Sequence, residues 1–182
     1  MTTQEPSPIV GPLGTHATIA GGTAAQEIDD QRRLIHTTMA PYGITAVPVP
    51  ENQPYWDGAK EGKLVIQRCQ SCGFYNHPPV VVCNSCCDRD AEQKWEQVSG
   101  RGTLYTHYIC YDTSIAGFEE KVPYAVILVE LEEQSDLLLM GNILNLEYDA
   151  VGTELPMGLP LEVIFDKASD EINIPQWQPR SS

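Results

Sequence analysis

Two Cys-x-x-Cys pairs, formed by Cys69 with Cys72 and by Cys83 with Cys86, limit what this chain can fold into more than any other feature of its sequence. Each pair places two thiolates on one tight turn. Two such turns that face each other make a closed tetrahedral cage, which suits a structural Zn²⁺ ion. Gly73 follows the first pair, where a turn is easiest without a Cβ atom. The spacing therefore predicts a metal site with these four cysteines as ligands. Because four thiolates also suit iron, a rubredoxin-like electron carrier is an alternative.

Disulfide pairing of these cysteines would require an oxidising compartment. The chain starts with Met1-Thr2-Thr3-Gln4-Glu5-Pro6, which lacks the basic and apolar segments of a secretory signal, so we expect free thiols and a cytoplasmic location. The longest apolar runs, such as 125–129, are far too short to span a bilayer, and no membrane partner is expected. Cys87 is expected to be a spare thiol rather than a substitute ligand, and Cys110 a small core residue.

The charge of the chain bears on a nucleic-acid-binding function. With 25 acidic and 11 basic side chains, the formal net charge is −14, which repels phosphate backbones at long range. The aromatic side chains that would form a base-stacking face are Tyr105, Tyr108, Tyr111, Tyr124 and Trp95. Only Arg101 and Lys121 supply positive charge near them. A nucleic-acid-binding module is thus the second alternative, and packing is the expected use of these rings.

The N-terminal region 1–53 is expected to form an extended arm with one helix. Pro, Gly, Thr and Ala dominate residues 1–22, which offer little apolar surface to bury. A capping box at 23–26 and apolar residues at helical spacing, Ile28, Ile35 and Met39, predict a helix over 24–38. We expect this arm to dock on another subunit through these three side chains. The alternative is that it folds back on the chain's own C-terminal barrel.

The remainder divides into a metal-binding unit over 54–94 and an all-β unit over 95–182. Pro54 and Gly62 bound an expected short helix, and residues 63–68 are an expected strand that leads into the first cysteine pair. The expected strands of the C-terminal unit are 103–111, 123–131, 136–146 with a bend at Gly141, 161–166, and 171–177 broken at Pro175. Short strands with Gly bends suit a small Greek-key barrel, so the fold class is mainly β.

Several motifs together resemble the DUF35 family. They are Tyr55-Trp56, Gln67-Arg68-Cys69-x-x-Cys72-Gly73, Pro78-Pro79, Cys83-x-x-Cys86, Ser99-Gly100-Arg101-Gly102-Thr103-Leu104-Tyr105, Pro123-Tyr124-Ala125, Leu128-Val129-Glu130-Leu131 and Gly158-Leu159-Pro160-Leu161-Glu162-Val163. The resemblance covers about 54–178. It implies a rubredoxin-like zinc ribbon followed by an OB-fold barrel, with the N-terminal helical arm as an addition. Two departures are Val80, where the family often has Arg, and Cys87, where Gly is usual.

The resemblance implies a role beside thiolase-like enzymes. Members accompany thiolases, retro-aldolases, acyltransferases and hydroxymethylglutaryl-CoA synthase as a second subunit that supports the partner's CoA site. We therefore expect a non-catalytic zinc-binding subunit, in an α2β2 hetero-oligomer with a thiolase-like catalytic subunit that shares acyl-CoA. The resemblance supplies no catalytic residue, and neither it nor the sequence identifies the acyl group.

Contacts to CoA are expected at local cations, because the chain is acidic overall. The candidate cofactor-binding residues are Phe74, Tyr75, Arg89, Lys94, Trp95 and Arg101. The cations would face the CoA phosphates, with Lys121 as a further candidate. The aromatic rings would line a path for the pantetheine arm at the junction of ribbon and barrel.

Two other constellations are interpreted as structural. His107 and Cys110 suggest a nucleophilic pair, but their odd separation on an expected strand places them on opposite faces. Asp112 and Ser114 near His107 suggest a hydrolase triad, but no nucleophile-elbow glycine pattern surrounds Ser114. His77 is expected to lie outside the ligand set, either at the surface or in support of the metal site.

Overall fold

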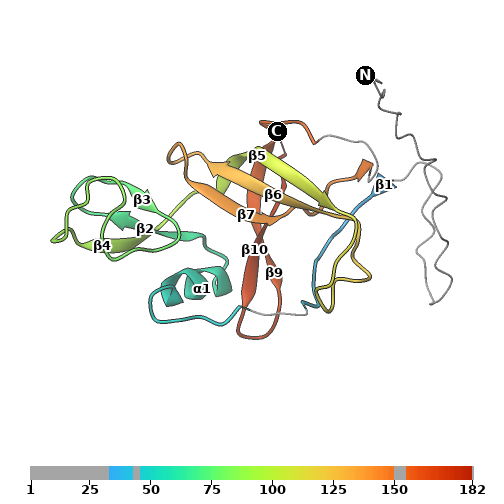
Figure 1. Cartoon of the computed structure of the whole chain (residues 1–182), viewed down its shortest axis with the longest axis horizontal. Helices are drawn as coiled ribbons and strands as arrows, with labels where there is room; N and C mark the ends of the chain where they lie inside the picture. Colours follow the sequence, from blue (N-terminus) through green and yellow to red (C-terminus); the bar gives the residue numbers. More distant parts are fainter. Residues whose placement is uncertain (1–32, 43–45, 150–154, 182) are drawn as a thin grey trace, which may run out of the picture.

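The computed structural model describes residues 33–42, 46–149 and 155–181. A small ribbon and a larger β-barrel lie side by side, and the one helix of the described part packs where they meet (Figure 1). The ribbon sheet has the order β3-β2-β4 and the barrel sheet the order β10-β9-β5-β6-β7. This arrangement confirms the mainly β fold class with a ribbon followed by a barrel.

The ribbon unit begins with helix α1 (Gln53–Lys60), followed by β2 (Val65–Cys69), β3 (Tyr75–Asn76) and β4 (Gln93–Gln97). Pro54 lies in the first turn of α1, and Gly62, with φ +73°, follows its end, as expected from the sequence. Gly58 lets the helix approach β2, because a Cβ atom there would collide with Val65. Asn173 donates from Nδ2 to the carbonyls of Ala59 and Lys60, both at 3.3 Å, and so ties the helix to the barrel.

The barrel consists of β5 (Arg101–Cys110), β6 (Tyr124–Leu131), β7 (Leu138–Asn142), β9 (Pro160–Lys167) and β10 (Asn173–Pro179), all paired antiparallel. Alternate residues of β6, from Ala125 through Leu131, fill the core, as period-2 patterning requires. The expected break at Pro175 is wrong. Pro175 lies where β10 pairs with β9 alone, a position at which a strand tolerates proline.

The barrel closes where the end of β7 meets β10. The backbone N–H of Leu144 donates to the Trp177 carbonyl at 2.7 Å, next to a parallel bridge between Ile143 and Trp177. Gly141 makes this approach possible, since a Cβ atom there would lie 2.8 Å from Cδ1 of the buried Trp177 ring. The sequence predicts a bend at Gly141, and in the structure this glycine provides room for the side chain of Trp177.

The expected helix over 24–38 is wrong in its described part. Arg33–Leu34 form strand β1, which pairs with β8 (Tyr148–Asp149). The rest of that helix, including its capping box and Ile28, lies outside the described residues. Met39 is fully buried on the chain's own barrel with Tyr124 and Leu144, whereas Ile35 is 58% exposed. Residues 33–42 thus fold back on the barrel, so Met39 is not available as an anchor for another subunit.

Asp166 of β9 holds this returning segment in place. Its carboxylate accepts hydrogen bonds from the Thr38 hydroxyl at 2.6 Å, the Met39 backbone N–H at 2.7 Å and the Tyr42 hydroxyl at 2.6 Å. Lys121 adds a bond from Nζ to the Ala40 carbonyl at 2.8 Å. Three hydrogen bonds to one charged acceptor explain why the returning segment adopts one fixed path, although it has neither helical capping nor a broad apolar face.

Candidate metal centre

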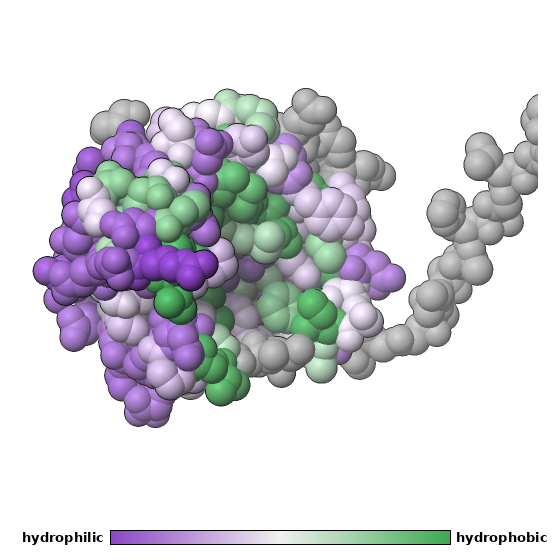
Figure 2. Space-filling model, turned by 60° about the vertical axis from the view of Figure 1, so that its left-hand side comes forward, coloured by the Kyte–Doolittle hydropathy of each residue, from purple (hydrophilic) through white to green (hydrophobic). Residues whose placement is uncertain are grey.

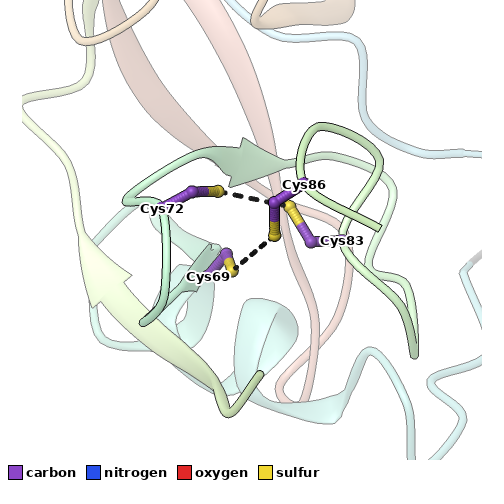
Figure 3. A group of neighbouring side chains, drawn as sticks. All are labelled: Cys69, Cys72, Cys83 and Cys86. Atoms are coloured by element: carbon purple, nitrogen blue, oxygen red, sulfur yellow. Dashed lines mark hydrogen bonds between the residues drawn. The ribbon is translucent and has the colours of Figure 1, made fainter. Parts of the chain in front are cut away.

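The four cysteines of the two Cys-x-x-Cys pairs converge on one point, although no metal ion is part of the structure (Figure 3). The Sγ atoms of Cys69 and Cys86 lie 3.7 Å apart, as do those of Cys72 and Cys83, and all four lie within 4.8 Å of one another. With Zn–S bonds of about 2.3 Å, the edges of a regular tetrahedron measure about 3.8 Å. The ligand set and its spacing therefore fit a structural Zn²⁺ ion.

The backbone makes the same turn at both cysteine pairs. The Gly73 N–H donates to the Cys69 carbonyl at 2.8 Å, and the Cys87 N–H donates to the Cys83 carbonyl at 3.0 Å. The residue that closes each turn is left-handed, with φ +79° at Gly73 and +54° at Cys87. Cys87 therefore occupies the position equivalent to Gly73, and its exposed thiol is not one of the four clustered sulfurs.

Replacing Cys87 by glycine is expected to stabilise the ribbon. Relief of the left-handed strain exceeds the extra entropy that glycine gains in the unfolded chain, for a net gain of about 0.5–1 kcal/mol. The measurement is thermal unfolding of the zinc-loaded protein. Cys87→Ser is the matched control: it removes the thiol, keeps the Cβ atom and should leave stability unchanged. Equal stabilisation by both variants would show that the thiol, not the backbone, is the cause.

Hydrogen bonds around the sulfurs favour thiolates at part of the site. Burial opposes ionisation of Cys83, but N–H groups of Cys86 and Ser85 and the Asn76 amide outweigh it and lower the pKa of the Cys83 thiol to about 6. The Asp88 N–H favours the Cys86 thiolate, yet burial and the three neighbouring sulfurs prevail and raise the pKa of that thiol to about 12. Four thiolates this close repel one another, so full ionisation requires the opposing charge of a cation.

Asn76 connects the metal site to the ribbon sheet. Its side chain is buried at the end of β3, with Nδ2 3.7 Å from the Cys83 sulfur and 3.4 Å from Oε1 of Gln93. Its Oδ1 accepts the backbone N–H of Asn84 at 3.1 Å. The amide thereby orients one ligand and the turn that carries it. Asn76 could not be identified from the sequence, because a lone Asn in an aromatic loop carries no local signal for this role.

Asn76→Leu is expected to accelerate zinc release by on the order of 10- to 100-fold, because supporting contacts of this kind contribute that much to metal affinity. Transfer of zinc to a chromogenic chelator measures the rate. Asn84→Ala is the control, since Asn84 is exposed and contributes its backbone N–H, which the substitution keeps. Equal release rates in wild-type protein and Asn76→Leu would contradict this role.

The ribbon is fastened to the barrel through Gln134, in the turn between β6 and β7. Its Oε1 accepts the Tyr75 N–H at 2.7 Å, and its Nε2 donates to the Tyr75 carbonyl at 3.1 Å. Tyr55 of α1 packs on the barrel core and lies 5.5 Å, ring to ring, from His77. Hydrophilic side chains cover much of the part that comes forward in Figure 2, and hydrophobic ones gather toward the middle of that view. Because its ring lies beside Tyr55, His77 belongs to the junction of ribbon and barrel and is not part of the sulfur cluster.

The aromatic members of the predicted CoA-binding set lie in the ribbon. Phe74 packs against the buried pair Cys69 and Cys83, and Tyr75 has the Arg68 guanidinium 5.0 Å from its ring centroid. Trp95 pairs with Gln67, next to these residues in the ribbon sheet.

The cationic members of the set are more dispersed. Lys94 forms a 3.2 Å ion pair with Glu92. Arg101 lies on the barrel and forms a 2.8 Å ion pair with Glu132. Arg89 is exposed and has no ion pair among the residues that the structure describes. The structure brings Tyr75, Lys94 and Trp95 close to β2, with Arg101 on a different sheet.

His107 and Cys110 lie on opposite faces of β5, as their spacing predicts. His107 pairs with the core residue Ile127, and its Nε2 accepts the Leu155 N–H at 3.3 Å. Cys110 pairs with Tyr124 on the outer face, is half-buried, and donates from its thiol to the Asp112 carbonyl at 3.0 Å. The two side chains therefore do not form a nucleophile–base pair.

Comparisons with known proteins agree with this architecture. Residues 56–92 match the family model of the ChsH2 rubredoxin-like zinc ribbon domain, and residues 95–166 match that of the ChsH2 C-terminal OB-fold domain. A solved structure, the Ltp2-ChsH2(DUF35) aldolase, has a chain that matches with a TM-score of 0.62 and 27% identity, over 74% of this chain and 98% of that chain. The described part of the chain contains no helix that could span a bilayer.

Two curated relatives are similar to this chain over more than half of its length. A DUF35 domain-containing scaffold protein of Methanocaldococcus jannaschii is 27% identical over 64% of this chain and 77% of its own length. A protein of Thermomonospora curvata named a probable enoyl-CoA hydratase alpha subunit is 30% identical over 71% of this chain. The match spans only 37% of that relative's length. The two matched domains, their order and the four-cysteine cluster show that this chain belongs to the DUF35 family, with a zinc ribbon and an OB-fold of the ChsH2 type.

Proposed function

We propose that this chain is a non-catalytic, zinc-binding subunit of a thiolase-type acyl-CoA complex whose catalytic subunit is a thiolase, retro-aldolase or acyltransferase. The observation that carries the proposal is the match over 98% of a chain in the Ltp2-ChsH2(DUF35) aldolase. The subunit holds the partner in its assembled form and shares its acyl-CoA site, in a cytoplasmic complex of α2β2 composition.

The chemistry of such complexes indicates which partner supplies the reactive groups. Claisen condensation and thiolysis require an activated thiolate, a base, and donors for the enolate or oxyanion. Four of the six cysteines of this chain form the metal cluster, and Cys110 is separated from His107 by the sheet. The thiolate and base are therefore assigned to the catalytic subunit, and this chain is assigned a structural role.

Contact with CoA is proposed at the ribbon, where Tyr75 and Trp95 flank β2. Among the candidate cations, Lys94 and Arg101 have carboxylate partners, whereas Arg89 is exposed without one in the described part of the chain. Arg89 is thus the candidate that we propose to meet a CoA phosphate. The complex should therefore have a lower affinity for CoA when Arg89 is replaced by glutamine.

The test of the proposed function is co-expression of the full chain with thiolase-like subunits of its own organism. Light scattering on the purified material should give a hetero-oligomer with the mass of an α2β2 assembly. Without this chain, the catalytic subunit should be weakly active or insoluble. A chain that stays alone beside every thiolase-like subunit, while its zinc site is filled, would contradict the proposal.

A further inference from the structure

The outer face of β5–β6–β7 carries no charged side chain across its two central rows. Two rows run across it: Thr106, Leu128 and Met140 in one, and Tyr108, Val126 and Asn142 in the other. Their neighbours along β6, such as Ile127, point into the barrel core. We call these six residues the outer apolar face. A barrel strand usually alternates apolar inside with polar outside, so an apolar surface on both sides indicates a binding surface.

One end of the sheet is already covered by the chain itself. There, Met39, Tyr42 and Phe118 pack over Tyr124 and form a second small core. The cover reaches Val126 but leaves most of the two rows open, since Tyr108 is 65% exposed and Met140 is 72% exposed. The outer apolar face is therefore open in the part of the chain that the structure describes.

Two hollows lie on this face and meet beside Met140. One of about 260 Å³ has Tyr42, Phe118 and Tyr124 in its wall, and one of about 320 Å³ has Tyr108 and Leu128. Val126 and Met140 line both. No Asp, Glu, Lys or Arg is among the described residues lining either hollow. Their size and lining suit inserted apolar side chains, each about as large as Leu, Met or Phe.

The loop beside the hollows gives the surrounding surface a negative charge. Asp112, Glu119 and Glu120 are exposed in the segment that carries Phe118. Lys121 has its ammonium group 2.8 Å from the Ala40 carbonyl and 3.4 Å from the Thr38 carbonyl, so it is turned toward the returning N-terminal segment. An apolar floor with an acidic margin complements a protein surface that has projecting apolar side chains and Lys or Arg around them.

We infer that the outer apolar face is the docking surface for the catalytic subunit, an inference that rests on the proposed function. Apolar side chains of the partner enter the hollows on either side of Met140, and basic residues of the partner meet Asp112, Glu119 and Glu120. Gln134 fastens the zinc ribbon to this same barrel.

The test uses the full chain, loaded with zinc, and the purified thiolase-like subunit with which it assembles. Met140→Glu and Tyr108→Glu place a charge on the docking surface at exposed positions, where folding is not affected. Each is expected to weaken the complex by on the order of 100-fold, as a charge buried in the centre of an interface does. Val47→Glu is the matched control, since Val47 is 81% exposed, lies in the connector before α1 and should leave affinity unchanged. Raising the salt concentration from about 50 to 500 mM should slow association.

Methionine oxidation gives a second readout that does not depend on a substitution. Met140 should oxidise freely in the isolated chain and be protected in the complex, while Met157, which is 62% exposed, should react equally in both. Protection of Met140 in the isolated chain would overturn the inference, because the same chain would then cover this face. If that protection grows with protein concentration, a second copy covers it instead. If Met140→Glu leaves the complex intact while Val81→Glu, at an 86% exposed position on the ribbon, disrupts it, the interface lies on the ribbon instead. If wild-type protein forms no complex, the proposed function itself fails.

Discussion

Cys83→Ser is expected to lose the metal and unfold the ribbon. Cys83 is buried among the ligands, 3.7 Å from the Cys72 sulfur, and also receives the Asn76 amide. Binding of a structural Zn²⁺ ion contributes roughly 10 kcal/mol or more to the folding of zinc-finger peptides, and this ribbon likewise has little apolar core of its own. Metal analysis should give one zinc per wild-type chain and close to none in the variant, which should be insoluble or fail to bind a partner.

Cys87→Ser is the control for this experiment, because it replaces an exposed thiol next to the cluster but leaves all four ligands. It should retain one zinc per chain. A colourless wild-type protein would show that the metal is zinc, because an iron tetrathiolate absorbs visible light. A soluble, metal-free Cys83→Ser protein that still supports full activity of the complex would contradict the structural role of the metal.

Asp166→Ala is expected to lower the free energy of unfolding by about 3 kcal/mol, because three donors in a half-buried site lose a charged acceptor. The substitution removes the acceptor of the hydrogen bonds from Thr38, the Met39 backbone N–H and Tyr42. Residues 36–42 should detach before the barrel unfolds. Chemical denaturation measures the loss, and hydrogen exchange at the Met39 amide reports the local release.

Asp170→Ala is the matched control. Asp170 is 92% exposed and pairs with Lys167 on the surface, so its removal should change stability by no more than about 0.5 kcal/mol. Unchanged exchange at Met39 in Asp166→Ala would show that the apolar contacts of Met39, rather than the carboxylate, hold the segment.

The ribbon could be predicted from the sequence because its fold is set by local spacing. Two cysteines per turn, with glycine after the first pair, leave few arrangements that bring four sulfurs together, and the structure has them within 4.8 Å. The barrel strands were predictable to within a few residues wherever apolar positions alternate, as in β6. The break expected at Pro175 does not occur, because a local break signal does not reveal that β10 has only one partner strand there.

The returning segment could not be predicted by the same reasoning. Ile35 and Met39 have helical spacing, but Met39 is buried by Tyr124 and Leu144, which lie far along the chain. The segment's hydrogen bonds end on Asp166, which is also distant in sequence. Tertiary contacts of this kind override a weak helical pattern.

Polar connections between distant segments were missed for a similar reason. Asn76 supports a metal ligand, and Gln134 joins ribbon to barrel, yet each is an ordinary amide in a turn or strand end in the sequence. Their roles depend on which groups the fold brings within 4 Å, and neither composition nor spacing expresses that. The four ligands could be identified beforehand because their chemistry is rare, whereas amides are common.

The most direct test of the non-catalytic role is turnover of a panel of acyl-CoA esters by three samples: this chain alone, its thiolase-like partner alone, and the reconstituted complex. We expect no turnover by the chain, weak turnover by the partner and full turnover by the complex. Complexes that carry His107→Ala or Cys110→Ala should retain rate constants within a few-fold of wild type, because these residues lie on opposite faces of β5. Turnover by the purified single chain that Cys110→Ala abolishes would contradict the account and make this chain an enzyme in its own right.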